Sequence, residues 1–173
     1  HTVSGYHRAK QHLEDWQWKH PAPIQISACG RRTRHLPRLW TGVEITSMLS
    51  GVEVHILGYA FKSSHPALQP YLHHTAPKGR EQQAEVVIRA IQRAGGMAIL
   101  AHPCRYRRGA EELVQAAVTC GIDGIEAYYA YDSPKTWRPC PKKTPSMQQL
   151  ADRLGLLRTC GTDTHGKNIT RRI

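Results

Sequence analysis

The sequence lacks any long apolar run. Across its 173 residues no apolar stretch approaches the roughly 18 residues that a membrane-spanning helix needs. The start HTVSGYHRAK also lacks the pattern of a secretory signal peptide. We therefore expect no membrane partner.

Paired cysteines are also lacking. The five cysteines form no CxxC pair, which argues against a disulfide framework or a structural zinc knuckle. Free thiols are typical of a reducing compartment, so the sequence predicts a cytoplasmic protein.

Acidic residues are scarce. Asp and Glu number 13 against 24 Lys and Arg, which gives a formal net charge of +11 at pH 7. Such a surface attracts anions, among them phosphorylated metabolites, nucleic acids and acidic lipids. Aromatic residues make up only 7% and do not follow the pattern of a base-stacking platform. The apolar share of 40% and the charged share of 21% exclude a collagen-like or wholly disordered chain.

Alternating strand and helix patterns predict an α/β protein. A helical pattern over 3–19 is followed by a basic, loop-like segment over 28–38. The ranges 39–46 and 52–61 are typical of strands, and their short connection favours an antiparallel hairpin. After a loop over 62–78, apolar spacing predicts helices at 84–94, 113–118 and 147–154, alternating with strands at 97–101, within 122–131 and at 156–162. This order indicates parallel βα units.

Five chemically reactive side chains lie in these strands or at their ends. His102 ends one predicted strand, Asp163 and His165 follow the last one, and Glu44 and His55 lie on the two hairpin strands. Taken singly, a histidine in a strand is usually packed and an Asp-x-His pair usually caps a turn. Functional groups of α/β proteins gather at the carboxyl ends of parallel strands, and imidazole with carboxylate suits Zn, Mn or Fe rather than Ca. Together the five residues predict a metal site.

Several segments occur in the order of the motifs of a known family. GVEIT, VEVHILGYAF, ILAHPCRY, CGIDGIEAYY and CGTDTHG resemble the PHP (polymerase and histidinol phosphatase) domain, in its single-domain phosphoesterase branch. The likeness runs from Thr2 to His165. It implies a distorted (β/α)7 barrel that binds about two or three divalent ions at its C-terminal face. It also implies hydrolysis of a phosphate ester, in a phosphorylated small molecule, a nucleotide or an oligonucleotide.

The resemblance also implies roles for the five residues. The implied metal ligands are Glu44, His55, His102, Asp163 and His165. Glu44 matches an acidic residue that often bridges two ions, and catalysis is expected to depend on Glu44, His102 and Asp163. A metal-activated water is the expected nucleophile, and a neighbouring His or Asp would help to protonate the leaving alkoxide.

On the substrate side, Arg105 matches a basic residue that can hold the phosphate. Tyr106 and Lys167 are weaker candidates for the same pocket. The segment between His55 and His102 is short, so we expect the helical insertion of some relatives to be absent and the substrate side to be more open.

The chain departs from the family at its start. The family opens with a strand bearing His-x-His and continues to a Thr-Asp-His segment, whereas HTVSGY resembles only the tail of that segment. We therefore expect residues 1–173 to form a single PHP-like domain that is N-terminally incomplete and lacks its first strands. His1 is not counted as a ligand, and a complete trinuclear cluster is not expected.

Two alternatives stay open at this point. The basic segment 31–38 and the run 105–108 also suit a non-catalytic module that binds anions or nucleic acid. Salt-dependent oligonucleotide binding without hydrolysis would indicate such a module. The other alternative is an inactive, truncated family member, whose uncovered sheet edge would be prone to aggregation.

Overall fold

The computed structural model describes residues 8–15, 25–26, 32–33, 39–73, 76–134 and 136–163. Residues 8–15 are helical, as the pattern over 3–19 predicts, and the rest of that range lies outside the described residues. Strands β1 (Gln25–Ile26) and β2 (Arg32–Thr33) pair in an antiparallel ladder. Arg32 therefore lies in a strand rather than in the predicted loop, and the other arginines of the basic segment 28–38 lie outside the described residues.

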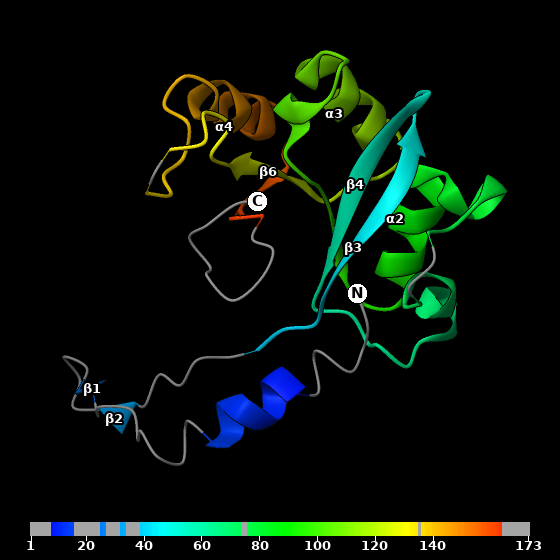
Figure 1. Ribbon diagram of the computed structural model, residues 1–173, viewed down its shortest axis with the longest axis vertical. Helices are drawn as coiled ribbons and strands as arrows, with labels where there is room; N and C mark the ends of the chain where they lie inside the picture. The colour runs from blue at the N-terminus through cyan, green and yellow to red at the C-terminus, as the bar shows by residue number, and fades with distance from the viewer. Residues whose placement is uncertain are drawn as a thin grey trace.

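The main body of the structure is one mixed sheet with the strand order β3-β4-β5-β6-β7 (Figure 1). Its strands are β3 (Gly42–Leu49), β4 (Val52–Tyr59), β5 (Met97–Leu100), β6 (Gly124–Tyr128) and β7 (Leu157–Cys160). β3, β4 and β5 pair in antiparallel fashion, whereas β5, β6 and β7 are parallel. The predicted hairpin and the predicted parallel βα units are confirmed. Within the described residues the sheet is open, with β3 and β7 at its edges, and no closed barrel is seen there.

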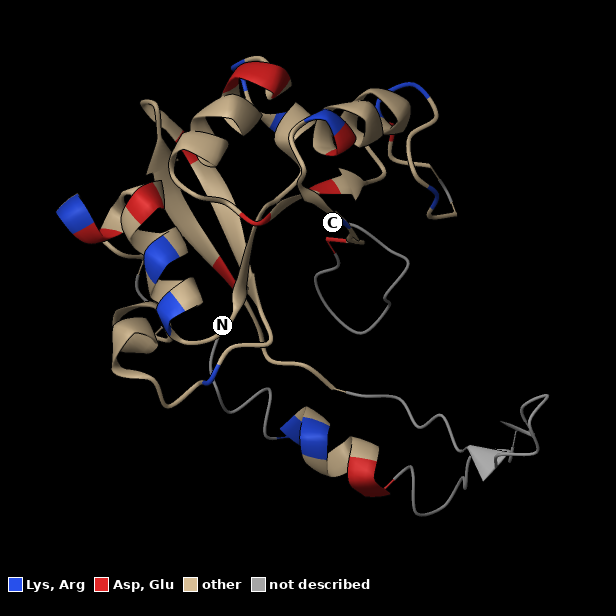
Figure 2. Ribbon diagram, turned by 180° about the vertical axis from the view of Figure 1, so that it is seen from behind, with Lys and Arg blue, Asp and Glu red and all other residues tan. Residues whose placement is uncertain are grey.

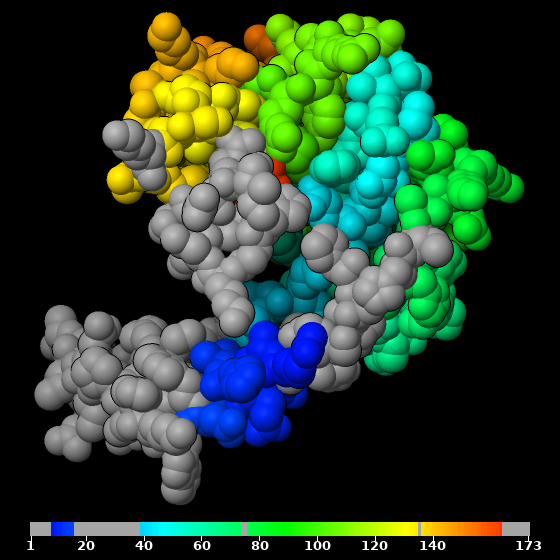
Figure 3. Space-filling view, viewed as in Figure 1, coloured from blue at the N-terminus to red at the C-terminus, as the bar shows by residue number. Residues whose placement is uncertain are grey.

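A helix connects each pair of consecutive strands after β4. α2 (Ala84–Arg93) leads to β5, α3 (Ala110–Thr119) leads to β6 and α4 (Thr144–Arg153) leads to β7. Short 3₁₀ helices η1 (Pro66–Tyr71), η2 (Gly79–Gln82) and η3 (Pro103–Arg105) lie in the connections. η1 falls in the predicted loop 62–78, where the side chain of His65 accepts a hydrogen bond from the N–H of Ala67 and caps it. The space-filling view shows the hairpin and the segments around α2, α3 and α4 as one continuous body (Figure 3).

One row of apolar residues shows which face of the sheet the helices cover. Ile45, Ile56, Leu100 and Ile125 are successive neighbours in the register of β3 to β6, and all four are buried. They belong to one hydrophobic cluster with residues of α2, α3 and α4, among them Val87, Ile88, Ile91, Leu113, Val114, Met147 and Leu150. Side chains alternate along a strand, so residues next to this row, including Glu44 and His55, lie on the opposite face.

The β3–β4 hairpin differs from its prediction at both ends of β3. The strand predicted at 39–46 runs over 42–49, because it continues to a two-residue turn formed by Ser50 and Gly51. Both turn residues have positive φ values, 50° and 77°. Two positive φ angles match the right-handed twist of the flanking strands. The tighter turn extends the pairing up to Leu49 and Val52.

The helices are surface elements that pack one face on the sheet. α2 carries one acidic segment near its start and then two basic ones (Figure 2), and Glu85 and Arg89 form an ion pair of 2.7 Å. None of the helices in the described part of the chain has the length and apolar character that crossing a membrane requires. Cys104, Cys120, Cys140 and Cys160 are free thiols, as predicted, and Cys29 lies outside the described residues.

Candidate metal centre

Glu44 and His55 face each other across the hairpin. In the register of β3 and β4, Glu44 lies opposite Leu57 and Thr46 lies opposite His55, so Glu44 and His55 are diagonal neighbours. Long side chains on one face reach such neighbours. Oε1 of Glu44 lies 2.8 Å from Nδ1 of His55.

The third side chain of the cluster comes from the end of β5. The N–H of Ala101 donates to the carbonyl of His55 at 3.0 Å, which holds the end of β5 against β4. The next residue, His102, turns away from the strand and is 3% exposed. Its Nε2 lies 3.8 Å from Oε1 of Glu44. Glu44, His55 and His102 each offer one ligand atom within 4.8 Å of the other two. Three of the five predicted ligands therefore converge on one point.

The imidazole nitrogens at this point are buried and lack ordinary partners. Nδ1 of His55 and both ring nitrogens of His102 have no hydrogen-bond partner among the described residues. The contact of 2.8 Å between His55 and Glu44 is short but does not have hydrogen-bond geometry. Buried polar atoms nearly always have a partner, and an orphaned one calls for an explanation such as an ion. Two imidazoles and a carboxylate form a donor set that suits Zn, Mn or Fe. The residues therefore fit a divalent ion.

The close approach also sets the electrostatics of the cluster. Contacts with His102 and His55 hold the pKa of Glu44 far below its ordinary value, despite partial burial. The contact with Glu44 raises the pKa of His55, against the opposing effect of burial. The carboxylate is therefore ionised and attracts positive charge, for which protons and a metal ion compete.

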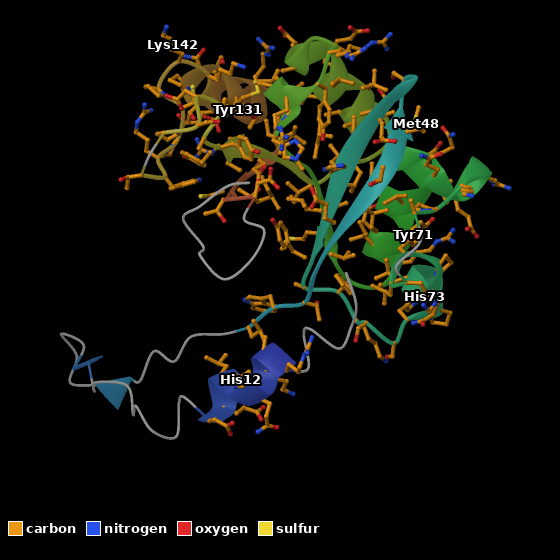
Figure 4. The ribbon with its side chains drawn as sticks, viewed as in Figure 1. His12, Met48, Tyr71, His73, Tyr131 and Lys142 are labelled. Atoms are coloured by element: carbon orange, nitrogen blue, oxygen red, sulfur yellow. The ribbon has the colours of Figure 1, made fainter. Side chains whose placement is uncertain are left out.

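Two tyrosines pack on His102. The ring of Tyr106 lies 5.4 Å from that of His102 and the ring of Tyr129 lies 5.2 Å from it, measured between ring centroids. Tyr129 in turn packs on Tyr131, which is labelled in Figure 4, with 4.8 Å between the ring centroids. The hydroxyl of Tyr106 accepts a hydrogen bond of 2.8 Å from the main-chain N–H of His55, and burial raises its pKa. Tyr106, a weaker candidate for the phosphate pocket, thus braces two of the three converging residues.

Changing Tyr106 to phenylalanine tests this brace. The variant leaves the N–H of His55 without its acceptor in a partly buried place, so we expect the free energy of unfolding to fall by about 1–3 kcal/mol. Urea unfolding followed by circular dichroism measures it. Tyr128→Phe is the matched control, because it removes only a contact with the side chain of Gln148. Equal stability of Tyr106→Phe and the wild type would show that the hydrogen bond does not brace the site.

Asp163 lies beside the cluster with two other partners. Its Oδ2 accepts hydrogen bonds of 2.6 Å from Nη1 of Arg105 and 2.6 Å from the hydroxyl of Tyr129. Nη1 of Arg105 also donates to the Tyr129 hydroxyl at 3.0 Å. Asp163 is outside the group of three close ligand atoms, yet it lines the same cavity of about 220 Å³ as Glu44 and His102. Its role as a ligand stays a prediction, as does that of His165, which lies outside the described residues together with Lys167.

Sequence reasoning did not select Glu126 and Tyr129 as site residues. Glu126 lies on β6, is 3% exposed and lines the cavity, and its Oε2 accepts a hydrogen bond of 3.0 Å from the N–H of His102. Tyr129 is fully buried. One signal was present in the sequence: Glu126 is a carboxylate inside the otherwise apolar strand GIEAYY, and carboxylates are almost never fully buried without a partner.

Burial also sets the protonation state of Tyr59, a tyrosine that lines the cavity. Tyr59 of β4 lines it beside Glu44, and burial raises the pKa of Tyr59 to about 12. Its phenol is therefore neutral near pH 7 and adds no negative charge to the three carboxyl groups of the cavity.

The comparisons with known proteins concern the fold. No family model and no curated protein matches the chain. Among solved structures, it is similar to an amidohydrolase from Chromobacterium violaceum with a TM-score of 0.57 and 21% identity, over 73% of this chain and 67% of that one. It is also similar to a proposed metal-dependent phosphoesterase from Bifidobacterium adolescentis, with a TM-score of 0.56 and 19% identity, over 74% of this chain and 68% of that one. At these identities the likeness establishes a shared mixed α/β fold.

Proposed function

We propose that this chain is a metal-dependent hydrolase of phosphate esters, of the PHP type. The observation that carries the proposal is the convergence of Glu44, His55 and His102, with buried imidazole nitrogens that have no hydrogen-bond partner among the described residues. The neighbour from C. violaceum was solved with bound sulfate, an anion with the tetrahedral shape of phosphate, and that from B. adolescentis is named for phosphoester chemistry. The PHP resemblance adds the finer expectations of a (β/α)7-type barrel and of about two or three ions of Mn, Zn or Fe.

The three converging residues would hold the ion. When bound, a divalent ion lowers the pKa of a coordinated water towards neutrality and stabilises charge on phosphoryl oxygens. Glu44 supplies the negative charge that attracts the ion, and the two imidazoles supply neutral donors. Tyr106 and Tyr129 pack on His102 and keep water away from its ring.

Arg105 is the residue that would bind and orient the phosphate. Its side chain is 45% exposed, and its ion pair with Asp163 places it beside the cavity of Glu44 and His102. A guanidinium offers paired N–H donors that match the oxygens of a phosphate. The hydroxyl of Tyr129 contacts both Arg105 and Asp163, so it fixes their relative orientation. The substrate is thus a phosphorylated small molecule, a nucleotide or an oligonucleotide.

The direct test is a screen of phosphate esters with the full chain and added Mn²⁺, Zn²⁺ or Fe²⁺. We expect release of inorganic phosphate or of a nucleotide that a chelator suppresses. Salt-dependent binding of oligonucleotides without hydrolysis under all three metals would instead favour a non-catalytic anion-binding module.

Changing Arg105 to glutamine tests its assigned role. Loss of a charged hydrogen-bond donor to phosphate is expected to raise KM about ten- to hundredfold, with metal content unchanged. Steady-state kinetics on the best substrate of the screen measures the effect. Arg107→Gln, in the same connection and exposed, is the matched control. An unchanged KM in Arg105→Gln would remove Arg105 from the phosphate site.

A further inference from the structure

We propose that Glu126 is a positioning residue of the metal centre. Its carboxylate holds the main chain of His102 in the turned conformation that aims the imidazole at Glu44 and His55. The inference rests on the proposed function in one respect, namely that a metal ion is what His102 binds.

The pairing of β5 with β6 stops one residue before Glu126. Ile99 pairs with Gly124 and Leu100 with Ile125, so Glu126 is the next residue of β6 along this register. Successive N–H groups of a strand point to opposite sides. The N–H of Ala101 points to β4, where it donates to the carbonyl of His55, and that of His102 points to β6.

On the β6 side, the N–H of His102 donates to a side chain and not to the main chain. Oε2 of Glu126 lies 3.0 Å from the N–H of His102. A hydrogen bond to an ionised carboxylate is stronger than one to a carbonyl. The N–H of His102 thus has its acceptor although the ladder ends there. The main chain can therefore leave the sheet at this residue.

The conformation of His102 needs such support. Its φ of 29° and ψ of 59° lie in the left-handed region that residues with a side chain rarely adopt. The following residue is Pro103, and a residue before proline favours extended backbone. Unfavourable backbone conformations persist only where the surroundings impose them. The hydrogen bond to Glu126 and that from the N–H of Arg105 to the carbonyl of His102, at 2.9 Å, hold the residue from both of its main-chain groups.

Gly161, which lies in the segment after β7, leaves space for the carboxylate of Glu126. It follows β7, and its N–H donates to the carbonyl of Tyr128 at 3.2 Å. A Cβ atom at position 161 would overlap Oε1 of Glu126. A side chain there would force the carboxylate to move, and we expect this to weaken its hydrogen bond from the N–H of His102. Position 161 therefore controls Glu126 without being a ligand itself.

The experiment is a titration of the full chain with Co²⁺, followed by visible absorption, which reports both affinity and coordination geometry. Gly161→Ala keeps the charge of Glu126 but displaces it, so we expect Co²⁺ binding about ten- to hundredfold weaker, with an altered spectrum. Glu126→Ala should behave in the same way. Glu126→Gln keeps an acceptor oxygen and should retain the wild-type spectrum, although loss of its charge weakens binding. Glu112→Gln, an exposed change on α3, controls for net charge.

A second readout needs no metal. Hydrogen exchange of the His102 amide, followed by NMR, should be about tenfold faster in Glu126→Ala and Gly161→Ala than in the wild type and Glu126→Gln. If Glu126→Ala does not fold, Gly161→Ala and Glu126→Gln decide the question. Wild-type affinity, spectrum and exchange in Gly161→Ala would overturn the inference and leave the proposed function intact. A wild-type chain that binds no Co²⁺ would overturn the proposed function, and the metal-coupled part of the inference with it.

Discussion

Replacing His102 by alanine is expected to abolish metal-dependent hydrolysis. His102 is buried, its two ring nitrogens have no hydrogen-bond partner among the described residues, and it lies between the hairpin and the tyrosines that brace it. Mutation of a residue that only supports a metal ligand already lowers metal affinity or activity by about ten- to hundredfold. Loss of a ligand is expected to exceed that range, so turnover should fall by more than about a hundredfold.

The measurement is the initial rate of phosphate release at saturating metal and substrate. His73→Ala is the matched control, because His73, labelled in Figure 4, is exposed, follows η1 in the chain and does not belong to the cluster. Asp163→Ala is a second variant on the predicted ligand set and is also expected to lose turnover. Unchanged metal-dependent activity in both His102→Ala and Asp163→Ala would show that the site has been misassigned.

The largest effect on stability is expected from Gly124→Ala. Gly124 lies at the centre of the parallel part of the sheet, between Ile99 of β5 and Leu157 of β7. A Cβ atom there would lie 2.6 Å from the carbonyl oxygen of Leu157 and 2.7 Å from Cδ1 of Ile99. The carbonyl is main chain and cannot turn aside, so β6 and β7 must separate. We expect the free energy of unfolding to fall by about 3 kcal/mol, at the upper end of the range for overpacked cores.

Urea unfolding of the wild type and the variant measures this difference. Gly42→Ala is the matched control, since no atom lies within 4 Å of a Cβ built at Gly42. A Gly124→Ala protein as stable as the wild type would contradict the close packing of β5, β6 and β7.

Much of the fold follows from periodicity in the sequence. The apolar spacing of Val87, Ile88 and Ile91 predicts α2, and the alternation of Val54 and Ile56 predicts β4, because in both cases one face is buried in the core. The bounds of β3 do not follow in the same way. They depend on two positive φ angles at Ser50 and Gly51, and a serine does not signal such a conformation. Closure of the sheet into a barrel depends on pairing at its edges, and the periodicity along one strand does not predict that pairing.

The types of ligand residue at the site can be predicted from the sequence, but the residues that position these ligands cannot. Glu44, His55 and His102 are predicted because carboxylate and imidazole groups recur in or at the ends of separate strands, and the structure brings them together. The pairing of Asp163 with Arg105 and Tyr129 depends on the approach of η3, β6 and the segment after β7, which are distant in sequence. Glu126 was missed for the same reason. Its role arises from the register between β5 and β6 and from the space at Gly161, neither of which has a local pattern.

Metal content of the purified chain tests the central claim most directly. Mass spectrometry on the tag-free protein is expected to find about one ion or more of Mn, Fe or Zn per chain. The variant in which Glu44 and His55 are both replaced by alanine should contain none, while remaining folded by circular dichroism. Equal metal content in the two proteins, or no metal in the wild type after incubation with each ion, would contradict a metal centre built on Glu44, His55 and His102.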